Sequence, residues 1–198
     1  PAGGRPEKLR ILAPDSRRLE DARRELGDLP VEFYEIGFGD VWLRDTAPVF
    51  LFDDKGRLTA GCFEFNGWGE KYSLPSDSEV SARIAEKVGG STVKFPWVLE
   101  GGSIEVDGEG TCLTTEQCLL NPNRNPDMSK SQIENALRES LGVTKVLWLG
   151  QGLVNDHTDG HIDTLARFVA PGKVVCMAPS GPKDPNTEAL LKIEQDLR

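Results

Sequence analysis

The chain has 198 residues, which is long enough for one large domain with its own hydrophobic core. Hydrophobic residues make up 38% of it and charged residues 28%, which is ordinary for a globular protein, and no apolar run approaches the ~20 residues of a membrane span. The formal net charge of -9 argues against nucleic acid or an anionic membrane surface as the main partner, and it suits a small cationic substrate.

Helical and strand-like segments alternate along the whole chain. Apolar periodicity, capping residues and turn signals predict the following elements in chain order: strand Leu9–Ala13, helix Ser16–Leu26, strands Val31–Ile36, Val49–Phe52 and Leu58–Phe65, helix Ser78–Val88, strands Ile104–Val106 and Thr111–Thr115, helix Lys130–Leu141, strands Thr144–Leu149, Thr164–Val169 and Val174–Ala178, and a helix from about Asn186 to the end of the sequence.

The helix starts recur at a regular spacing. They fall near residues 16, 78, 130 and 186, roughly 52 to 62 residues apart, and each helix is followed by a strand, a polar loop and a hairpin. A repeat of this size predicts a radial array of α/β units, because one unit cannot bury its apolar face alone. Three units look complete and a fourth has begun, so we expect a fragment, or a chain that relies on a second one.

Acidic residues beside glycines or aromatic residues recur after three successive helices. The three runs are 41–48, 100–103 and 155–163. In a radial array equivalent loops converge on the axis, so three carboxylates that are distant in sequence and a histidine are expected to face one pocket.

Carboxylates gathered in one pocket repel each other unless a cation lies among them. A guanidinium fits well, because it is planar, always charged and pairs bidentately with carboxylates. Attack on its carbon requires a nucleophile and a general acid for the departing ammonia, and His161 is the candidate acid. Asp163 follows His161 by two positions and is expected to share its face of an extended segment.

Four runs of sequence resemble one known family. They are VWLRDTAP (41–48), FNGWGEKY (65–72), EGGSIEVDGEGTCLTTEQCLLNPNRNP (100–126) and NDHTDGHIDTLARF (155–168), and they are similar to agmatine deiminase and its bacterial peptidyl-arginine deiminase relatives. The resemblance implies the pentein fold, an α/β propeller of five pseudo-symmetric ββαβ repeats. Residues 1–198 are then a partial pentein domain, with repeats at approximately 9–65, 66–120 and 121–178 and the start of a fourth at 179–198.

The resemblance also implies an activity in polyamine metabolism. A hydrolase of this kind converts agmatine to N-carbamoylputrescine and ammonia through a covalent intermediate on a cysteine, without a cofactor or metal. Asp45 and Asp163 match the aspartates that hold the guanidinium, and Glu100 and His161 complete the polar shell. All four are expected to be catalytic, and Glu100 is also expected to bind the substrate. His161 protonates the leaving group and then activates water, and Trp42 matches an aromatic position that lines the substrate channel.

Three positions depart from the family pattern. The GGNIHC-like stretch that carries the nucleophilic cysteine is absent, so the nucleophile is expected outside this chain, about two repeats further on. Ala47 replaces a commonly found glycine. His157, predicted to bind substrate, occupies a position that is often acidic or otherwise polar in relatives, which leaves the group that recognises the amine open.

Other hypotheses remain open from the residues. The substrate could instead be peptidyl-arginine, or the chain could be a fragment that binds a guanidinium without catalysis. A third hypothesis is a zinc hydrolase, in which His157, His161 and a carboxylate bind the metal. Trp68 and Trp97 are expected to be packing residues, and Asn121–Asn123 a turn.

The cysteines and the start of the chain bear on the cellular compartment of the protein. Cys62, Cys112, Cys118 and Cys176 show no CxxC spacing, so reduced thiols in a cytoplasmic protein are expected, and a homo-oligomer is possible. No signal peptide opens the sequence, and the lack of an initial methionine leaves open an upstream start.

Overall fold

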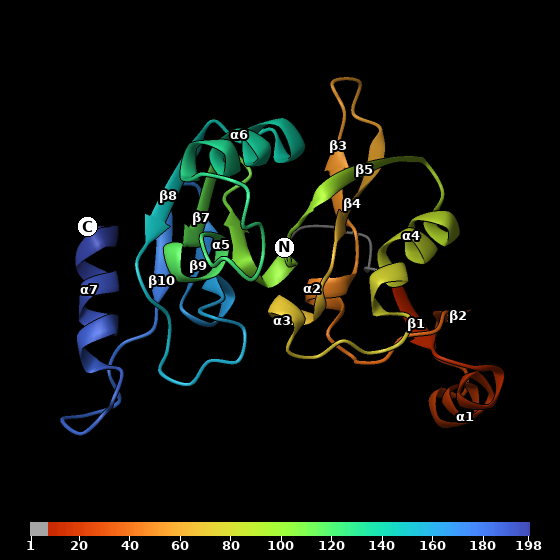
Figure 1. Ribbon diagram of the computed structural model, residues 1–198. Coiled ribbons are helices and arrows are strands. Elements are labelled where there is room, and N and C mark those ends of the chain that lie inside the picture. The colour runs from red at the N-terminus through yellow and green to blue at the C-terminus, as the bar shows by residue number, and fades with distance from the viewer. Residues whose placement is uncertain (1–7) are drawn as a thin grey trace.

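Four small β-sheets follow one another along the chain in the computed structural model, which describes residues 8–198 (Figure 1). The elements in chain order are β1 (Leu9–Ala13), α1 (Ser16–Leu26), β2 (Val31–Glu35), α2 (Leu43–Thr46), β3 (Val49–Phe52), β4 (Leu58–Glu64), α3 (Gly67–Glu70), α4 (Asp77–Val88), β5 (Ser91–Val98), the 3-10 turn η1 (Gly101–Ser103), β6 (Ile104–Val106), β7 (Thr111–Thr115), α5 (Glu116–Leu119), α6 (Lys130–Leu141), β8 (Lys145–Leu149), the 3-10 turn η2 (Ile162–Thr164), β9 (Ala166–Ala170), β10 (Lys173–Cys176) and α7 (Thr187–Leu197).

The two central sheets share one topology. In each, a hairpin of two antiparallel strands is followed by a helix and a third strand that pairs in parallel, giving the orders β3-β4-β5 and β6-β7-β8. At the N-terminal side β1 and β2 pair in parallel around α1, and at the C-terminal side β9 and β10 form a hairpin before α7. The recurring unit is therefore ββαβ, as predicted.

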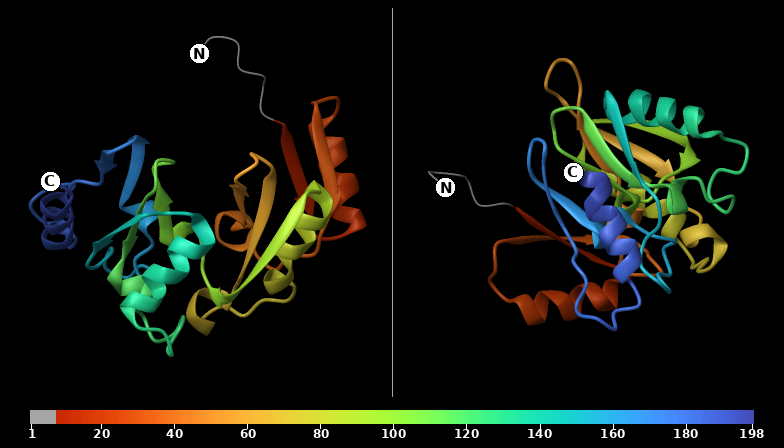
Figure 2. Two further views of the ribbon diagram at one scale, coloured as in Figure 1. Left: turned by 90° about the horizontal axis from the view of Figure 1, so that it is seen from above. Right: turned by 90° about the vertical axis from the view of Figure 1, so that its left-hand side faces the viewer.

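The units are arranged in chain order across the molecule. Figure 1 shows α1 and β1 at one side and α7 at the other, with the long helices α4 and α6 near the outside and the short helices α2, α3 and α5 toward the middle. The view from above in Figure 2 shows the same order along an arc. The short helices and the turns between sheets therefore occupy the inner side of the array.

The long helices begin and end at residues that the sequence marks for that purpose. Asp15 caps α1 by accepting a hydrogen bond from the Arg18 backbone, and Ser129 forms a capping box with Gln132 at the start of α6. Gly142 ends α6 in the left-handed region with φ of 69°, where a side chain is disfavoured. The helix boundaries are consequently close to those predicted.

Three local predictions were wrong. No strand was predicted at β5, whose apolar pattern is interrupted by Lys94 and Pro96; β5 lies at the edge of its sheet, where proline is tolerated. The strand predicted from Thr164 begins at Ala166, because residues 162–164 form η2. Asp163 therefore does not share a strand face with His161, although both still reach the same pocket.

The sheets also show where one unit ends and the next begins. The two complete sheets span residues 49–98 and 104–149, with a connection between them at 99–103. The approximate boundaries predicted at 65/66 and 120/121 each fall inside one of these sheets. The helix spacing revealed the period of the repeat but not its phase, because the first strand of a unit is set by sheet pairing between distant residues.

The hydrophobic core lies between the sheets and the long helices. One cluster joins β5, β6 and β7 to α6 through Trp97, Ile133 and Leu137, and a second packs α7 against β7 and β8 through Leu190 and Ile193. Burial of the α7 stripe fixes the C-terminal helix to the preceding sheet. Within residues 8–198, no helix combines the length and the apolarity needed to cross a bilayer.

Candidate active site

Three connections between successive sheets bring the predicted catalytic residues together. The connection from β2 to β3 carries α2 with Asp45, the connection from β5 to β6 carries Glu100 and η1, and the connection from β8 to β9 carries His161 and Asp163 around η2. The turn η1 contacts both α2 and η2. Equivalent segments of neighbouring ββαβ units therefore meet, although they are far apart in the sequence.

Asp45 is held in place by two neighbouring loops. Its Oδ1 accepts a hydrogen bond from the backbone N of Gly102 at 2.8 Å, and its Oδ2 accepts one from Nε1 of Trp68 at 3.0 Å. Burial raises the pKa of Asp45 above its usual value, and the nearby His161 and the two hydrogen bonds offset this only in part. Each oxygen keeps a free lone pair, so the oriented carboxylate can accept a cation.

His161 lies between two carboxylates. Its Nδ1 is 3.7 Å from Oδ1 of Asp45, and its Nε2 is 3.6 Å from Oε2 of Glu100. Burial lowers the pKa of His161, but Glu100, Asp45 and Asp163 outweigh that effect, so the pKa lies above the usual value. Within residues 8–198 the buried Nε2 has no hydrogen-bond partner. The imidazole can therefore hold a proton near neutral pH and deliver it to a reacting group.

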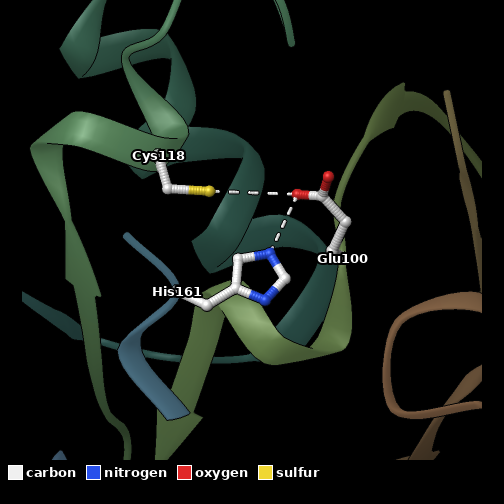
Figure 3. A group of neighbouring side chains, drawn as sticks. All are labelled: Glu100, Cys118 and His161. Atoms are coloured by element: carbon white, nitrogen blue, oxygen red, sulfur yellow. Dashed lines mark hydrogen bonds and ion pairs between the residues drawn. The ribbon is translucent and has the colours of Figure 1, made fainter. Parts of the chain in front are cut away.

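Glu100 lies behind His161, away from the open pocket. Figure 3 shows one carboxylate oxygen facing both the imidazole and the thiol of Cys118, whose Sγ is 3.9 Å away. The other oxygen accepts a hydrogen bond from Nε of Arg124 at 2.8 Å. The side chain has no exposed surface, and Glu100 is the one predicted site residue that does not line the pocket. Of the predicted site residues, the one that its carboxylate pairs with is His161.

Arg124, which was not predicted from the sequence to be a site residue, is a buried cation beside the pocket. Besides Glu100, its guanidinium donates to Oδ2 of Asp159 at 2.6 Å and to Oδ1 of Asn123 at 2.8 Å. Lys71 pairs with the same Asp159 carboxylate at 2.7 Å. This network joins the loop after α5 to the connection before η2, and so fixes the segment that leads to His161.

A pocket of about 390 Å³ is lined by Asp45, His161 and Asp163. Its walls carry both histidines of the chain, the carboxylates of Asp40, Asp45 and Asp163, and the rings of Trp42, Trp68 and Tyr72. Among the described residues, no lysine or arginine lines it. Negative charge combined with aromatic faces favours a planar organic cation.

The remaining predicted residues lie at the walls and the mouth of the pocket. Trp42 is 59% exposed at the start of α2, and Asp163 is 3.9 Å from Nε of Arg44. His157 stacks on Tyr72 with ring centroids 6.0 Å apart, and its Nδ1 bonds the tyrosine hydroxyl. Thus Trp42, His157 and Asp163 all face the space that a substrate would occupy.

Trp68, expected to be only a packing residue, also forms a hydrogen bond within the site. It is buried, as expected, but it also donates to Asp45 from a left-handed turn in which its φ is 55°. Bulky residues are uncommon in that region, and strained positions cluster at functional sites. The signal was present in the glycines at 67 and 69, which flank Trp68 and also have positive φ. Asn123, interpreted as a turn residue, likewise bonds Asp159.

The geometry contradicts the hypothesis of a two-histidine zinc site. Within residues 8–198 the one group placed to hold a metal is Glu100, Cys118 and His161, whose ligand atoms lie within 4.8 Å of one another, and His157 is not part of it. The guanidinium of Arg124 already neutralises Glu100. Burial raises the pKa of the Cys118 thiol well above its usual value, so it remains a protonated donor to Glu100.

Replacing Gly102 by alanine is expected to disrupt this site. The added Cβ would lie 2.4 Å from Nδ1 of His161 and 2.6 Å from Oδ1 of Asp45, which are closer than real contacts allow. We expect a loss of about 1–3 kcal/mol in the free energy of unfolding and displacement of the side chains of both Asp45 and His161. Urea unfolding measures the first effect. Gly181→Ala, at a position with no atom within 4 Å of the added Cβ and no positive φ, is the control, and equal losses would contradict the prediction.

Three kinds of comparison place the chain among known proteins. Residues 4–198 match the model of the Porphyromonas-type peptidyl-arginine deiminase family. An agmatine deiminase of Pseudomonas aeruginosa is 42% identical over 190 residues, which cover 91% of this chain and 52% of that protein. The solved agmatine deiminase of Enterococcus faecalis has a TM-score of 0.88 at 37% identity, covering 94% of this chain and 52% of its own, and a substrate-bound agmatine deiminase of C. jejuni has a TM-score of 0.89 at 35% identity, covering 96% and 57%.

The fold is that of an α/β propeller of the pentein type, as the sequence predicted. More narrowly, the chain belongs to the Porphyromonas-type peptidyl-arginine deiminase family, which includes the agmatine deiminases. It spans about half the length of the relatives that it matches.

Proposed function

We propose that the natural protein that contains this chain is an agmatine deiminase, which hydrolyses agmatine to N-carbamoylputrescine and ammonia. The observation that carries the proposal is the pocket in which the carboxylates of Asp45 and Asp163 flank the buried His161. Two carboxylates match the in-plane N–H groups of a guanidinium, and the imidazole lies beside them to transfer protons. The similarity to agmatine deiminases favours agmatine as the substrate.

In the proposed reaction, Asp45 and Asp163 hold the guanidinium while a thiolate attacks its central carbon. A C–S bond forms, one C–N bond breaks, and His161 gives its proton to the departing ammonia. The neutral imidazole then takes a proton from water as the water oxygen adds to the carbon, and the thiolate leaves. Water has replaced one amino group, and the enzyme is regenerated. Glu100 acts through His161, since it contacts the imidazole and not the pocket.

The thiolate in this proposal comes from a segment outside this sequence. None of the four cysteines lines the pocket. Burial raises the pKa of Cys112 to about 12 and that of Cys118 well above its usual value, so neither forms a thiolate near neutral pH. The four thiols are free within the described residues, which fits the reducing cytoplasm as the setting.

Product analysis of the natural protein tests the proposal. The purified protein is incubated with agmatine, with free arginine and with an arginine-containing peptide, and ammonia and the carbamoyl products are measured. We expect N-carbamoylputrescine from agmatine, with little product from the other two. Citrulline formed in the peptide would identify a peptidyl-arginine deiminase instead. Release of no product from any of the three would overturn the proposed hydrolase activity.

A further inference from the structure

One carboxylate of the pocket has no role in the guanidinium chemistry. Asp45 borders His161, and Asp163 lies 3.9 Å from Arg44, whereas Asp40 has neither kind of neighbour. Asp40 is half-buried and lines the same pocket, and its Oδ1 accepts a hydrogen bond from the backbone N of the adjacent Val41 at 2.7 Å. Within residues 8–198 its Oδ2 forms no hydrogen bond and no ion pair, so this oxygen is available to a ligand.

The backbone around Asp40 is fixed by a buried side chain. Asp77, the first residue of α4, is only 2% exposed, and its Oδ1 accepts hydrogen bonds from the backbone N of Gly39 at 2.6 Å and of Asp40 at 3.2 Å. A Cβ on Gly39 would lie 2.4 Å from Cβ of Leu74, so the loop packs too closely for any other residue there. Asp40 therefore keeps a defined place on the pocket wall.

Burial gives the pocket a closed end and an open end. Asp45 is 8% exposed and His161 is 2% exposed, whereas Trp42 is 59% exposed and Asp40 is half-buried. A substrate that inserts its guanidinium between the catalytic groups extends outward along the aromatic wall. At this wall the Nδ1 atom of His157 is already engaged by the Tyr72 hydroxyl. Asp40 is thus the carboxylate that remains for the outer part of the substrate.

We propose that Asp40 is a specificity-determining residue that binds a primary ammonium group at the outer end of the substrate. The inference rests on the proposed function and adds to it a requirement on the substrate: a guanidine with a second positive charge, separated from the first by an apolar linker. A carboxylate in the place of that ammonium is repelled by Asp40. The pocket then selects decarboxylated, amine-bearing guanidines and disfavours guanidino acids.

Three ligands of similar length separate this role from a structural one. Agmatine carries the ammonium, n-butylguanidine has the same four-carbon chain without it, and 4-guanidinobutyrate has a carboxylate at that end. With the natural protein, Asp40→Asn is expected to lower kcat/KM for agmatine about tenfold, mostly through KM, because one charge-assisted contact is lost. Turnover of n-butylguanidine stays unchanged and that of 4-guanidinobutyrate rises. Asp54→Asn, which makes the same charge change on the exposed β3–β4 turn, alters none of the three.

The outcomes distinguish this inference from the proposed function. If Asp40→Asn weakens agmatine and n-butylguanidine equally, or changes neither, Asp40 does not recognise an ammonium, while the hydrolase assignment stands. If the unaltered protein turns over none of the ligands, the hydrolase assignment fails, and calorimetry still decides on Asp40. The unaltered protein must then bind agmatine more tightly than n-butylguanidine, and this difference must vanish in Asp40→Asn. If the unaltered protein binds the two ligands equally, or if the difference remains in the variant, the inference is overturned.

Discussion

Replacement of His161 by asparagine is expected to lower kcat/KM for agmatine by about 10²- to 10⁴-fold, the usual contribution of a general acid–base group. The imidazole lies 3.7 Å from Asp45 and 3.6 Å from Glu100, so in the proposed reaction it is placed to protonate ammonia beside a bound guanidinium. Steady-state assays of ammonia release by the natural protein measure the loss. His157, the other histidine, supplies a matched control: His157→Asn should cost far less, because its Nδ1 is engaged by Tyr72. Equal losses in the two variants would contradict the assignment.

The same residue sets the expected pH dependence. The pKa of His161 is raised by its carboxylate neighbours, so the proton needed for ammonia departure persists above the usual histidine pKa, and activity falls only as pH rises through the raised value. Asp45 must be ionised to bind the cation. Burial raises its pKa, so binding weakens on acidification at a higher pH than for an ordinary aspartate. An alkaline limb that persists unchanged in His161→Asn would assign that limb to another group.

Replacement of Arg124 by methionine is expected to lower the free energy of unfolding by about 3–5 kcal/mol, because it leaves a buried carboxylate without its cation. The side chains of Arg124 and Glu100 have no exposed surface and pair at 2.8 Å, and Asp159 loses the same partner. Urea unfolding of the natural protein measures the change. Activity should fall as well, since this network holds the segment that leads to His161.

Two further variants separate charge from packing at this position. Arg138→Met removes an exposed helical ion pair with Glu134 at 3.1 Å and should cost less than about 1 kcal/mol. Adding Glu100→Gln to Arg124→Met removes the uncompensated charge and should recover part of the lost stability. A similar loss for Arg124→Met and Arg138→Met, or no recovery in the double variant, would refute the buried-pair explanation.

Local signals explain why the long helices were predictable. Asp15, Ser129 and Gly142 act within one turn of the chain, and each lies at an end of its helix in the structure. β5 escaped prediction because its sequence mixes apolar residues with Lys94 and Pro96. It becomes a strand by pairing with β4, and such pairing depends on tertiary contacts as much as on propensity.

The residues of the candidate site likewise fall into those that the sequence predicted and those that it did not. Asp45, His161 and Asp163 stand out in the sequence because acidic residues recur with the repeat, and the structure places all three on the pocket. Trp68 and Arg124 gave weaker signals, because a tryptophan between glycines and an arginine after a turn have many ordinary explanations. Their roles depend on partners that are distant in sequence, namely Asp45 for the indole and Glu100 for the guanidinium.

The sequence by itself determined the class of secondary structure, the period of the repeat and the residue types that suit a guanidinium, since these depend on local chemistry and on spacing along the chain. Only the tertiary structure decided at which strand each ββαβ unit begins, that Glu100 lies behind His161, and that Asp40 lines the pocket. The physical reason is that strand pairing, burial and electrostatic environment arise between segments that meet only after the sheets have packed, as Gly102 shows by fitting closely between Asp45 and His161.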